Sequence, residues 1–98
     1  MKGPIAVPVT ATKYRRAPGA IAAQIDDQIV VLSPVDFTYH ALDAVGASVW
    51  NLLSDPMNLD QIIEGLTASY DVTPDQCRTD VVPFLDRMMT IGALEPLA

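Results

Sequence analysis

The sequence predicts an α+β domain in which a three-stranded antiparallel sheet is followed by three helices. Short apolar, β-branched runs separated by turn residues occupy residues 20–42, a pattern typical of short strands. Three amphipathic patterns, each preceded by a helix-capping residue, occupy residues 43–91. Of the 98 residues, 50% are hydrophobic, so the chain has the size and composition of a single domain with one modest core.

The first two strands are predicted to form a hairpin. Residues 20–25 and 28–33 are apolar runs, and Asp26 and Asp27 between them fit a two-residue turn. The stretch 29–32 is nearly continuous in apolar and β-branched residues, which indicates the central, most buried strand.

The third strand is predicted over residues 37–42, after a turn that contains Pro34. Alternation along a strand places Phe37, Tyr39 and Ala41 on one face. It places Thr38, His40 and Leu42 on the other. Because helices follow this strand directly, we expect residues 38–42 to form a sheet edge that is free to accept a partner strand.

Each predicted helix begins after a residue whose side chain can accept a backbone N–H. These N-cap residues are Asp43, Asn58 and Thr73. The helices are predicted to end before Asp55, at Tyr70 and near Ile91, where Gly92 is the stop signal. Trp50 is the expected core anchor of the first helix.

Two residues are unusual inside helices. Gly46 costs about 1 kcal/mol relative to alanine, which indicates a close backbone contact at that position. Pro83 removes one helical hydrogen bond, so we expect it to kink the third helix or split it in two.

The third helix carries two apolar stripes. The first contains Cys77, Val81, Phe84, Met88 and Ile91, and the second contains Val82, Leu85 and Met89. Either both stripes are buried, or one packs on the core while the other lines a groove beside the edge strand. Methionine side chains adapt to varied partners, which fits a groove.

Charge is distributed unevenly along the chain, whose formal net charge is −6. Residues 1–18 contain four of the six basic residues and no acid. We predict a flexible basic arm over residues 1–18, with docking to an acidic partner as the alternative, and a folded domain over residues 19–98. The acidic excess of that domain argues against nucleic acid as a partner. No apolar run approaches the ~20 residues of a membrane span.

The sequence holds no pattern typical of catalysis. His40 is the only histidine and has no cysteine close in sequence, so we expect neither a metal nor another cofactor. Cys77 is the only cysteine, which is consistent with a reducing cytoplasm and with a role as a small buried hydrophobe. No paired carboxylates or nucleophile with a nearby base are present, so we do not expect an enzyme.

The order and spacing of residues over about 20–95 resemble a known family. The residues that carry the resemblance are Tyr39, Leu42, Asp43, Gly46, Val49, Trp50, Leu52, Leu53, Leu59, Ile62, Tyr70, Val72, Asp80, Val81, Phe84, Leu85, Met88, Gly92 and Leu94. This pattern is similar to that of the PqqD-like peptide chaperones, also called RiPP recognition elements. The basic, proline-bearing N-terminus looks most like the discrete leader-binding proteins of lasso-peptide biosynthesis. Pro83 departs from the usual run of helix formers in that family.

The resemblance implies a winged-helix-like fold and a non-catalytic role. Members bind the leader of a ribosomally made precursor peptide and present it to modifying enzymes. The leader would add as a strand to residues 38–42, in the cleft beside helix 73–91. For a lasso-peptide system, the implied partners are a leader peptidase and an ATP-dependent ring-closing synthetase.

The resemblance also implies the binding residues. The backbone groups are those of Thr38, Tyr39, His40, Ala41 and Leu42. The pocket walls come from Val81, Val82, Phe84, Leu85, Met88 and Met89. A polar rim comes from Arg78, Asp80 and Arg87.

Other hypotheses remain open. A PqqD-type chaperone would serve a radical enzyme instead. A winged-helix DNA-binding regulator would need a basic recognition helix, yet residues 74–91 hold three acids against two arginines. A small enzyme is the third class. An exposed edge strand also allows a homodimer.

Overall fold

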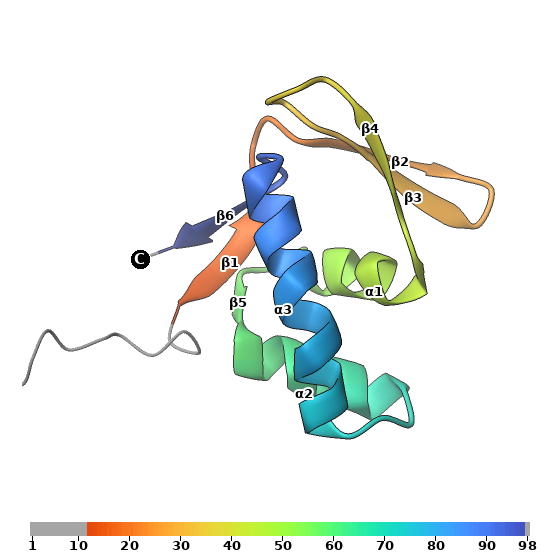
Figure 1. Ribbon diagram of the computed structural model, residues 1–98, viewed down its shortest axis with the longest axis vertical. Helices are drawn as coiled ribbons and strands as arrows, with labels where there is room; N and C mark the ends of the chain where they lie inside the picture. Colours follow the sequence, from red (N-terminus) through yellow and green to blue (C-terminus); the bar gives the residue numbers. More distant parts are fainter. Residues whose placement is uncertain (1–11, 98) are drawn as a thin grey trace, which may run out of the picture.

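The computed structural model describes residues 12–97 (Figure 1). The elements in chain order are β1 (Lys13–Arg16), β2 (Ile21–Ile25), β3 (Gln28–Leu32), β4 (Tyr39–Leu42), α1 (Ala44–Leu52), β5 (Met57–Asn58), α2 (Leu59–Ser69), α3 (Pro74–Thr90) and β6 (Leu94–Leu97). The sheet β2-β3-β4 lies at one end of the molecule and α2 at the other (Figure 1). Helix α3 runs between these two ends. Within the described residues, no helix is both long enough and apolar enough to cross a bilayer.

The predicted three-stranded antiparallel sheet is confirmed, with β3 as its central strand. Strand β3 pairs with β2 on one side and with β4 on the other. Val31 in β3 is fully buried, as expected for the most apolar run. Asp26 in the hairpin turn adopts a φ of 56°, which aspartate tolerates better than most residues. Phe37 has a φ of 58°, so the third strand begins at Tyr39, later than predicted.

A second sheet, ordered β5-β1-β6, was not predicted. Strand β1 pairs along its whole length with β6, from Lys13 opposite Leu97 to Arg16 opposite Leu94. Its other edge pairs with the two residues of β5. The first strand of the described residues, β1, therefore pairs with the last, β6.

The prediction of a flexible basic arm over residues 1–18 is wrong for residues 13–16, and residues 1–11 lie outside the described residues. Both arginines of this segment have partners. Arg15 forms an ion pair with Glu95, and Arg16 donates to the Trp50 carbonyl through Nη2 at 2.6 Å. The Arg16 guanidinium also lies over the Trp50 ring, 4.9 Å from its centroid. Tyr14, which precedes these two arginines, is only 5% exposed and belongs to the core.

The three helix starts follow the predicted caps. Asp43 accepts a hydrogen bond from the Gly46 N–H at 2.7 Å, and Thr73 accepts one from Gln76 at 3.1 Å. At the start of α2, Asn58 and its N3 residue exchange both hydrogen bonds of a capping box. These contacts satisfy backbone donors that no helical carbonyl reaches.

Helix α3 runs without interruption through Pro83, so the predicted split is wrong; a bend at this residue stays a prediction. Pro83 is on the exposed side of the helix. The carbonyl that loses its helical donor is that of Thr79, which is also exposed. Water can therefore hydrogen-bond to this carbonyl, and the helix continues.

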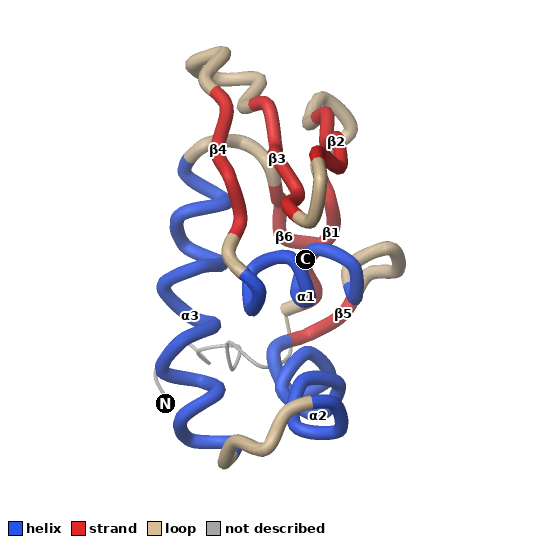
Figure 2. Tube along the Cα trace, turned by 90° about the vertical axis from the view of Figure 1, so that its right-hand side faces the viewer, coloured by secondary structure: helices blue, strands red, loops and turns tan. Residues whose placement is uncertain are grey.

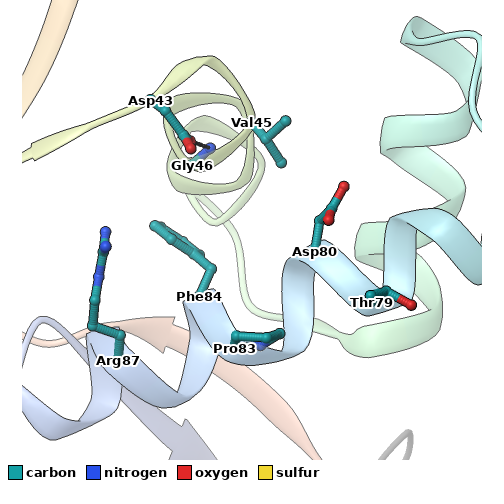
Figure 3. A pocket seen from close by; sticks show the side chains of 8 residues that line it. All are labelled: Asp43, Val45, Gly46, Thr79, Asp80, Pro83, Phe84 and Arg87. Atoms are coloured by element: carbon teal, nitrogen blue, oxygen red, sulfur yellow. Dashed lines mark hydrogen bonds between the residues drawn. The ribbon is translucent and has the colours of Figure 1, made fainter.

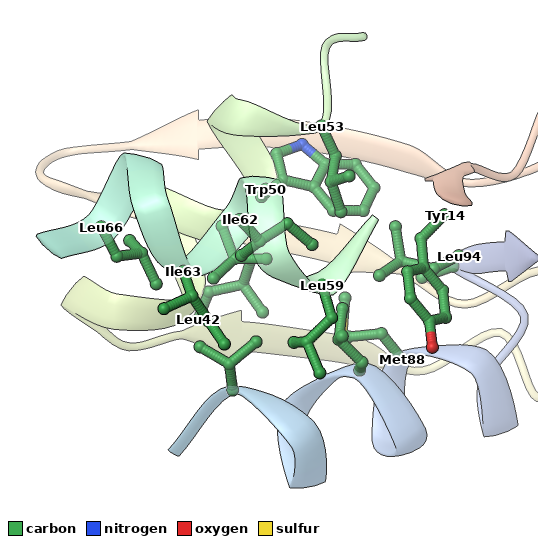
Figure 4. Close-up of a cluster of buried hydrophobic side chains, with 14 of the residues drawn as sticks. Tyr14, Leu42, Trp50, Leu53, Leu59, Ile62, Ile63, Leu66, Met88 and Leu94 are labelled. Atoms are coloured by element: carbon green, nitrogen blue, oxygen red, sulfur yellow. The ribbon is translucent and has the colours of Figure 1, made fainter. Parts of the chain in front are cut away.

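The core lies between the helices and the inner face of β3 and β4 (Figure 4). The buried residues of α3 are Cys77, Val81, Leu85 and Met88. This stripe differs from both predicted stripes, because Leu85 replaces Phe84 in it. Val82, Phe84 and Met89 are partly buried at its margins. Neither predicted arrangement of the stripes is therefore correct as stated.

Replacing Trp50 by alanine is expected to lower the free energy of unfolding by about 3–5 kcal/mol, because the side chain is 4% exposed and its loss leaves a cavity. Urea denaturation followed by circular dichroism measures this change. Ile25→Ala is the control: this side chain is 56% exposed, and the expected change is within about 0.5 kcal/mol. Equal effects of the two substitutions would contradict the assignment of Trp50 to the core.

Candidate functional site: a free strand edge and its groove

The edge of β4 that faces away from β3 has no strand partner among the described residues. Strand β4 is the last strand of its sheet and pairs only with β3. In Figure 2, β4 lies on the α3 side of the sheet. Its outer backbone groups are therefore available to another chain on that side.

The hydrogen-bonding register identifies which backbone groups point outward. The Ser33 N–H donates to the Thr38 carbonyl at 2.9 Å, so this pair is bonded across the two strands. Backbone groups alternate in direction along an antiparallel strand, so His40 and Leu42 also point toward β3. The N–H and C=O groups of Tyr39 and Ala41 consequently point to the free edge.

A groove lies next to the end of β4, between the start of α1 and the middle of α3 (Figure 3). Its volume is about 540 Å³. The residues that line it are Asp43, Val45, Gly46, Thr79, Asp80, Pro83, Phe84 and Arg87. We call this space the α3 groove. Because Asp43 directly follows β4, the free edge leads into it.

Gly46 allows α1 and α3 to approach closely at the α3 groove. A Cβ atom at this position would lie 2.8 Å from Cε1 of Phe84, which is shorter than any normal contact. The close backbone contact predicted for this glycine is therefore confirmed. The Phe84 ring is partly buried against α1 and forms the apolar middle of the groove (Figure 3).

The two ends of the groove wall on α3 carry opposite charges. Arg87 lies on one side of Phe84, with its guanidinium 5.7 Å from the ring centroid, and Asp80 lies on the other side (Figure 3). The carboxylate of Asp43 is occupied by the Gly46 N–H. No cluster of three or more His, Cys, Asp or Glu residues that could hold a metal ion occurs in the described part of the chain. The site therefore offers backbone hydrogen bonds, one apolar surface and three charged side chains, those of Asp43, Asp80 and Arg87.

Comparison with known proteins identifies the family. The family model of coenzyme PQQ synthesis protein D (PqqD) matches residues 28–94. The chain belongs to the PqqD family. No curated protein sequence matches it.

Solved structures share the fold of this PqqD-family protein. TbiB1 in complex with the TbiA(beta) leader peptide is 31% identical, with a TM-score of 0.75, and the alignment covers 86% of this chain and 98% of TbiB1. Lasso peptide synthetase B1 complexed with the leader peptide is 23% identical, with a TM-score of 0.73 and coverages of 85% and 98%. The PqqD truncation of Methylobacterium extorquens PqqCD, a stand-alone RiPP recognition element, is 24% identical, with a TM-score of 0.71 and coverages of 85% and 88%. The predicted resemblance and the α+β fold class are confirmed.

The structure divides the predicted backbone residues into two groups. Tyr39 and Ala41 present backbone groups to the free edge. His40 and Leu42 pair with β3, and both backbone groups of Thr38 have partners: its carbonyl accepts from Ser33 and its N–H donates to Asp36 at 3.0 Å. The strand as a whole is the predicted edge, but only alternate residues can offer hydrogen bonds to a guest.

Most of the residues predicted as pocket walls do not line the α3 groove. Val81, Leu85 and Met88 are at most 2% exposed and belong to the core, and Val82 and Met89 do not line the groove. Phe84, a predicted wall residue, and Asp80, a predicted rim residue, do line it. Because a helix turns by about 100° per residue, the stripe 77/81/85/88 and the stripe 80/83/84/87 face different directions.

The predicted polar rim needs one correction. The Arg78 side chain lies 3.6 Å from the Asp60 carboxylate, so it faces α2 instead of the α3 groove. Arg87 and Asp80 remain as rim residues. The prediction missed five residues that line the groove, namely Asp43, Val45, Gly46, Thr79 and Pro83. For those on α3, the spacing of residues 80, 83, 84 and 87 was the available signal. Cys77 is buried, and burial raises the pKa of its thiol, as expected for a packing residue.

The turn before β4 is tied to the end of α3. The buried Ser33 hydroxyl donates to the Ile91 carbonyl at 2.6 Å and accepts the Val35 N–H at 3.1 Å. Gly92 adopts a φ of 74° against Val35, where a Cβ would lie 2.7 Å from the valine methyl group. These contacts fix where β4 begins relative to α3.

Acidification is expected to weaken the hydrogen bonds between Thr38 and Asp36 in the turn before β4. The Thr38 hydroxyl and N–H donate to the Asp36 carboxylate, and these bonds lower the pKa of Asp36 below its ordinary value of 3.8. A lowered pKa means that the stabilisation is present above pH 3.8 and is lost as the pH falls through the lower, folded-state pKa. An NMR titration of the Asp36 carboxyl carbon should give a midpoint below 3.8, and Thr38→Val should raise it. A midpoint at or above 3.8 in the wild-type protein would contradict these bonds.

Gly46→Ala is expected to displace the Phe84 ring without unfolding the domain. Alanine favours the helix by about 1 kcal/mol, which offsets the contact, and the ring can move toward the open groove. The aromatic NMR signals of Phe84 should shift while the melting temperature changes little. Gly65→Ala is the control, because its Cβ would face Leu52 at 3.1 Å, outside the α3 groove. Unchanged Phe84 signals in Gly46→Ala would contradict the close approach.

Proposed function

We propose that this PqqD-family protein is a non-catalytic module that binds the leader segment of a ribosomally made precursor peptide. The leader would add as a strand to the outer edge of β4 and place side chains in the α3 groove. The observation that carries this proposal is the unpaired edge of β4 leading into a groove on α3. It is supported by the 31% identity to TbiB1, whose structure contains a leader peptide.

The free edge supplies affinity that depends little on the guest sequence. The outward N–H and C=O groups of Tyr39 and Ala41 can bond to the backbone of any extended segment. Each such bond contributes about 1 kcal/mol net. The α3 groove then selects among guests through the side chains that enter it.

The module would deliver its guest to modifying enzymes. By analogy with the lasso-peptide relatives, these are a leader peptidase and an ATP-dependent ring-closing synthetase in the cytoplasm, and the module itself needs no cofactor. A second copy of the chain could compete for the same edge and form a dimer. Sedimentation velocity with and without the guest would detect this competition, because a dimer through β4 must dissociate when the leader binds.

Ala41→Pro tests strand addition directly. Proline removes the outward N–H of Ala41 and adds a ring at the free edge, while the bonds of β4 to β3 use other residues. The affinity for a fluorescein-labelled leader peptide that the wild-type protein binds should fall about tenfold or more, because one hydrogen bond is lost and the proline ring clashes with the guest. Fluorescence polarisation measures the change, and circular dichroism checks the fold.

Ala22→Pro is the matched control at the opposite edge of the same sheet. Ala22 lies in β2 opposite Val31, so its N–H points away from β3 on the far side from α3. Leader affinity should equal that of the wild-type protein. Loss of binding in Ala22→Pro with full binding in Ala41→Pro would place the guest at the wrong edge and overturn the proposal.

A further inference from the structure

Among the described arginines, only Arg87 has neither a carboxylate nor a backbone carbonyl as partner of its guanidinium. Arg15 pairs with Glu95 and Arg78 with Asp60, while Arg16 donates to the Trp50 carbonyl. No carboxylate of residues 12–97 lies within ion-pair distance of Arg87. It lines the α3 groove in a chain whose net charge is −6, where carboxylates are abundant.

The position of Arg87 leaves its donors available. Its guanidinium lies over the Phe84 ring, 5.7 Å from the centroid. An arginine above an aromatic face is held by the ring and keeps its in-plane N–H groups for an acceptor. The planar fork of these donors matches a carboxylate, with which it can form two parallel hydrogen bonds.

The spacing along α3 relates this donor to the apolar middle of the groove. Phe84 and Arg87 are separated by about 4.5 Å along the helix axis, and Asp80 and Arg87 by about 10.5 Å. Side chains on one face of an extended guest repeat every two residues, or about 6.6 Å. One guest side chain can therefore contact Phe84 while the next side chain on the same face of the guest contacts Arg87.

We infer that the α3 groove selects guests in which an acidic side chain lies two residues from a bulky apolar side chain on the same strand face. This inference rests on the proposed function and names the class of leader that the site accepts. The apolar side chain covers Phe84, and the carboxylate pairs with Arg87. An acid placed on the other side of the apolar residue faces Asp80 and is rejected by like-charge repulsion.

A selection experiment with random peptides tests this preference, so the leader sequence itself is not required. A randomised peptide library displayed on phage is selected against the wild-type protein, Arg87→Glu and Arg78→Glu. The two variants change the net charge equally, but Arg78 faces Asp60 outside the groove. The wild-type protein and Arg78→Glu should enrich Asp or Glu two residues from a bulky apolar residue, on one side only. Arg87→Glu should enrich Lys or Arg at that position.

Binding of individual peptides then measures the pair. For an enriched peptide, changing its acid to lysine should weaken binding to the wild-type protein about fivefold or more, and Arg87→Glu should recover that loss. Equal losses in Arg87→Glu and Arg78→Glu would show general charge repulsion and overturn the inference. Absence of acid enrichment, or enrichment on both sides of the apolar residue, would also overturn it.

Failure of this inference is distinguishable from failure of the proposed function. If only the inference fails, peptides are still enriched, and Ala41→Pro still weakens their binding. If strand addition itself fails, Ala41→Pro and the wild-type protein bind the enriched peptides equally.

Discussion

Two close contacts hold α3 at a fixed position beside the sheet. The position of the free edge of β4 relative to α3 depends on both contacts. At one end, the Ser33 hydroxyl bonds to the last turn of α3, and Gly92 lies against Val35. Near the middle of α3, Gly46 lets the Phe84 ring lie on the α1 backbone. Strand β4 lies between these two contacts. Its outer edge has no strand partner among the described residues, and the α3 groove lies beside its end.

The rest of the domain supports this arrangement by keeping α3 in the core on its other side. Its stripe of buried residues, which includes Val81 and Met88, packs between the helices and β3. The sheet β5-β1-β6 covers the opposite side of the domain. Arg16 in β1 donates a hydrogen bond to the Trp50 carbonyl and so connects this sheet to α1. Helix α3 thus has one face in the core and another face in the α3 groove. A substitution on the first face changes core packing, whereas a substitution on the second changes the lining of the groove.

In the proposed function, the free edge of β4 supplies affinity for the guest and the α3 groove supplies selectivity. The backbone groups of Tyr39 and Ala41 would bond to any extended chain, whereas Phe84, Asp80 and Arg87 would respond to its side chains. An acidic domain repels acidic peptides at long range, so a single arginine in the groove acts as a local exception to the overall charge. Selection by such a residue is strong only when the neighbouring apolar contact fixes the guest in register.

The sequence by itself determined the local features. Turn residues, β-branched runs and capping residues such as Asp43 and Thr73 act within a few positions of the chain, so they fixed the hairpin, the edge strand and the three helices. The cost of Gly46 in a helix also indicated a close contact at this position, although the sequence did not identify Phe84 as the partner.

Only the tertiary structure decided which side chains meet. Strand β1 is short and charged, and its partners Glu95 and Trp50 are distant in sequence, so the segment resembled a flexible arm. The buried stripe and the groove-lining stripe of α3 are related by a rotation about the helix axis. The spacing of apolar residues alone does not define which of them faces the core. Long-range packing of α1, α2 and the sheet fixed that rotation, placing Leu85 inside and Phe84 in the groove.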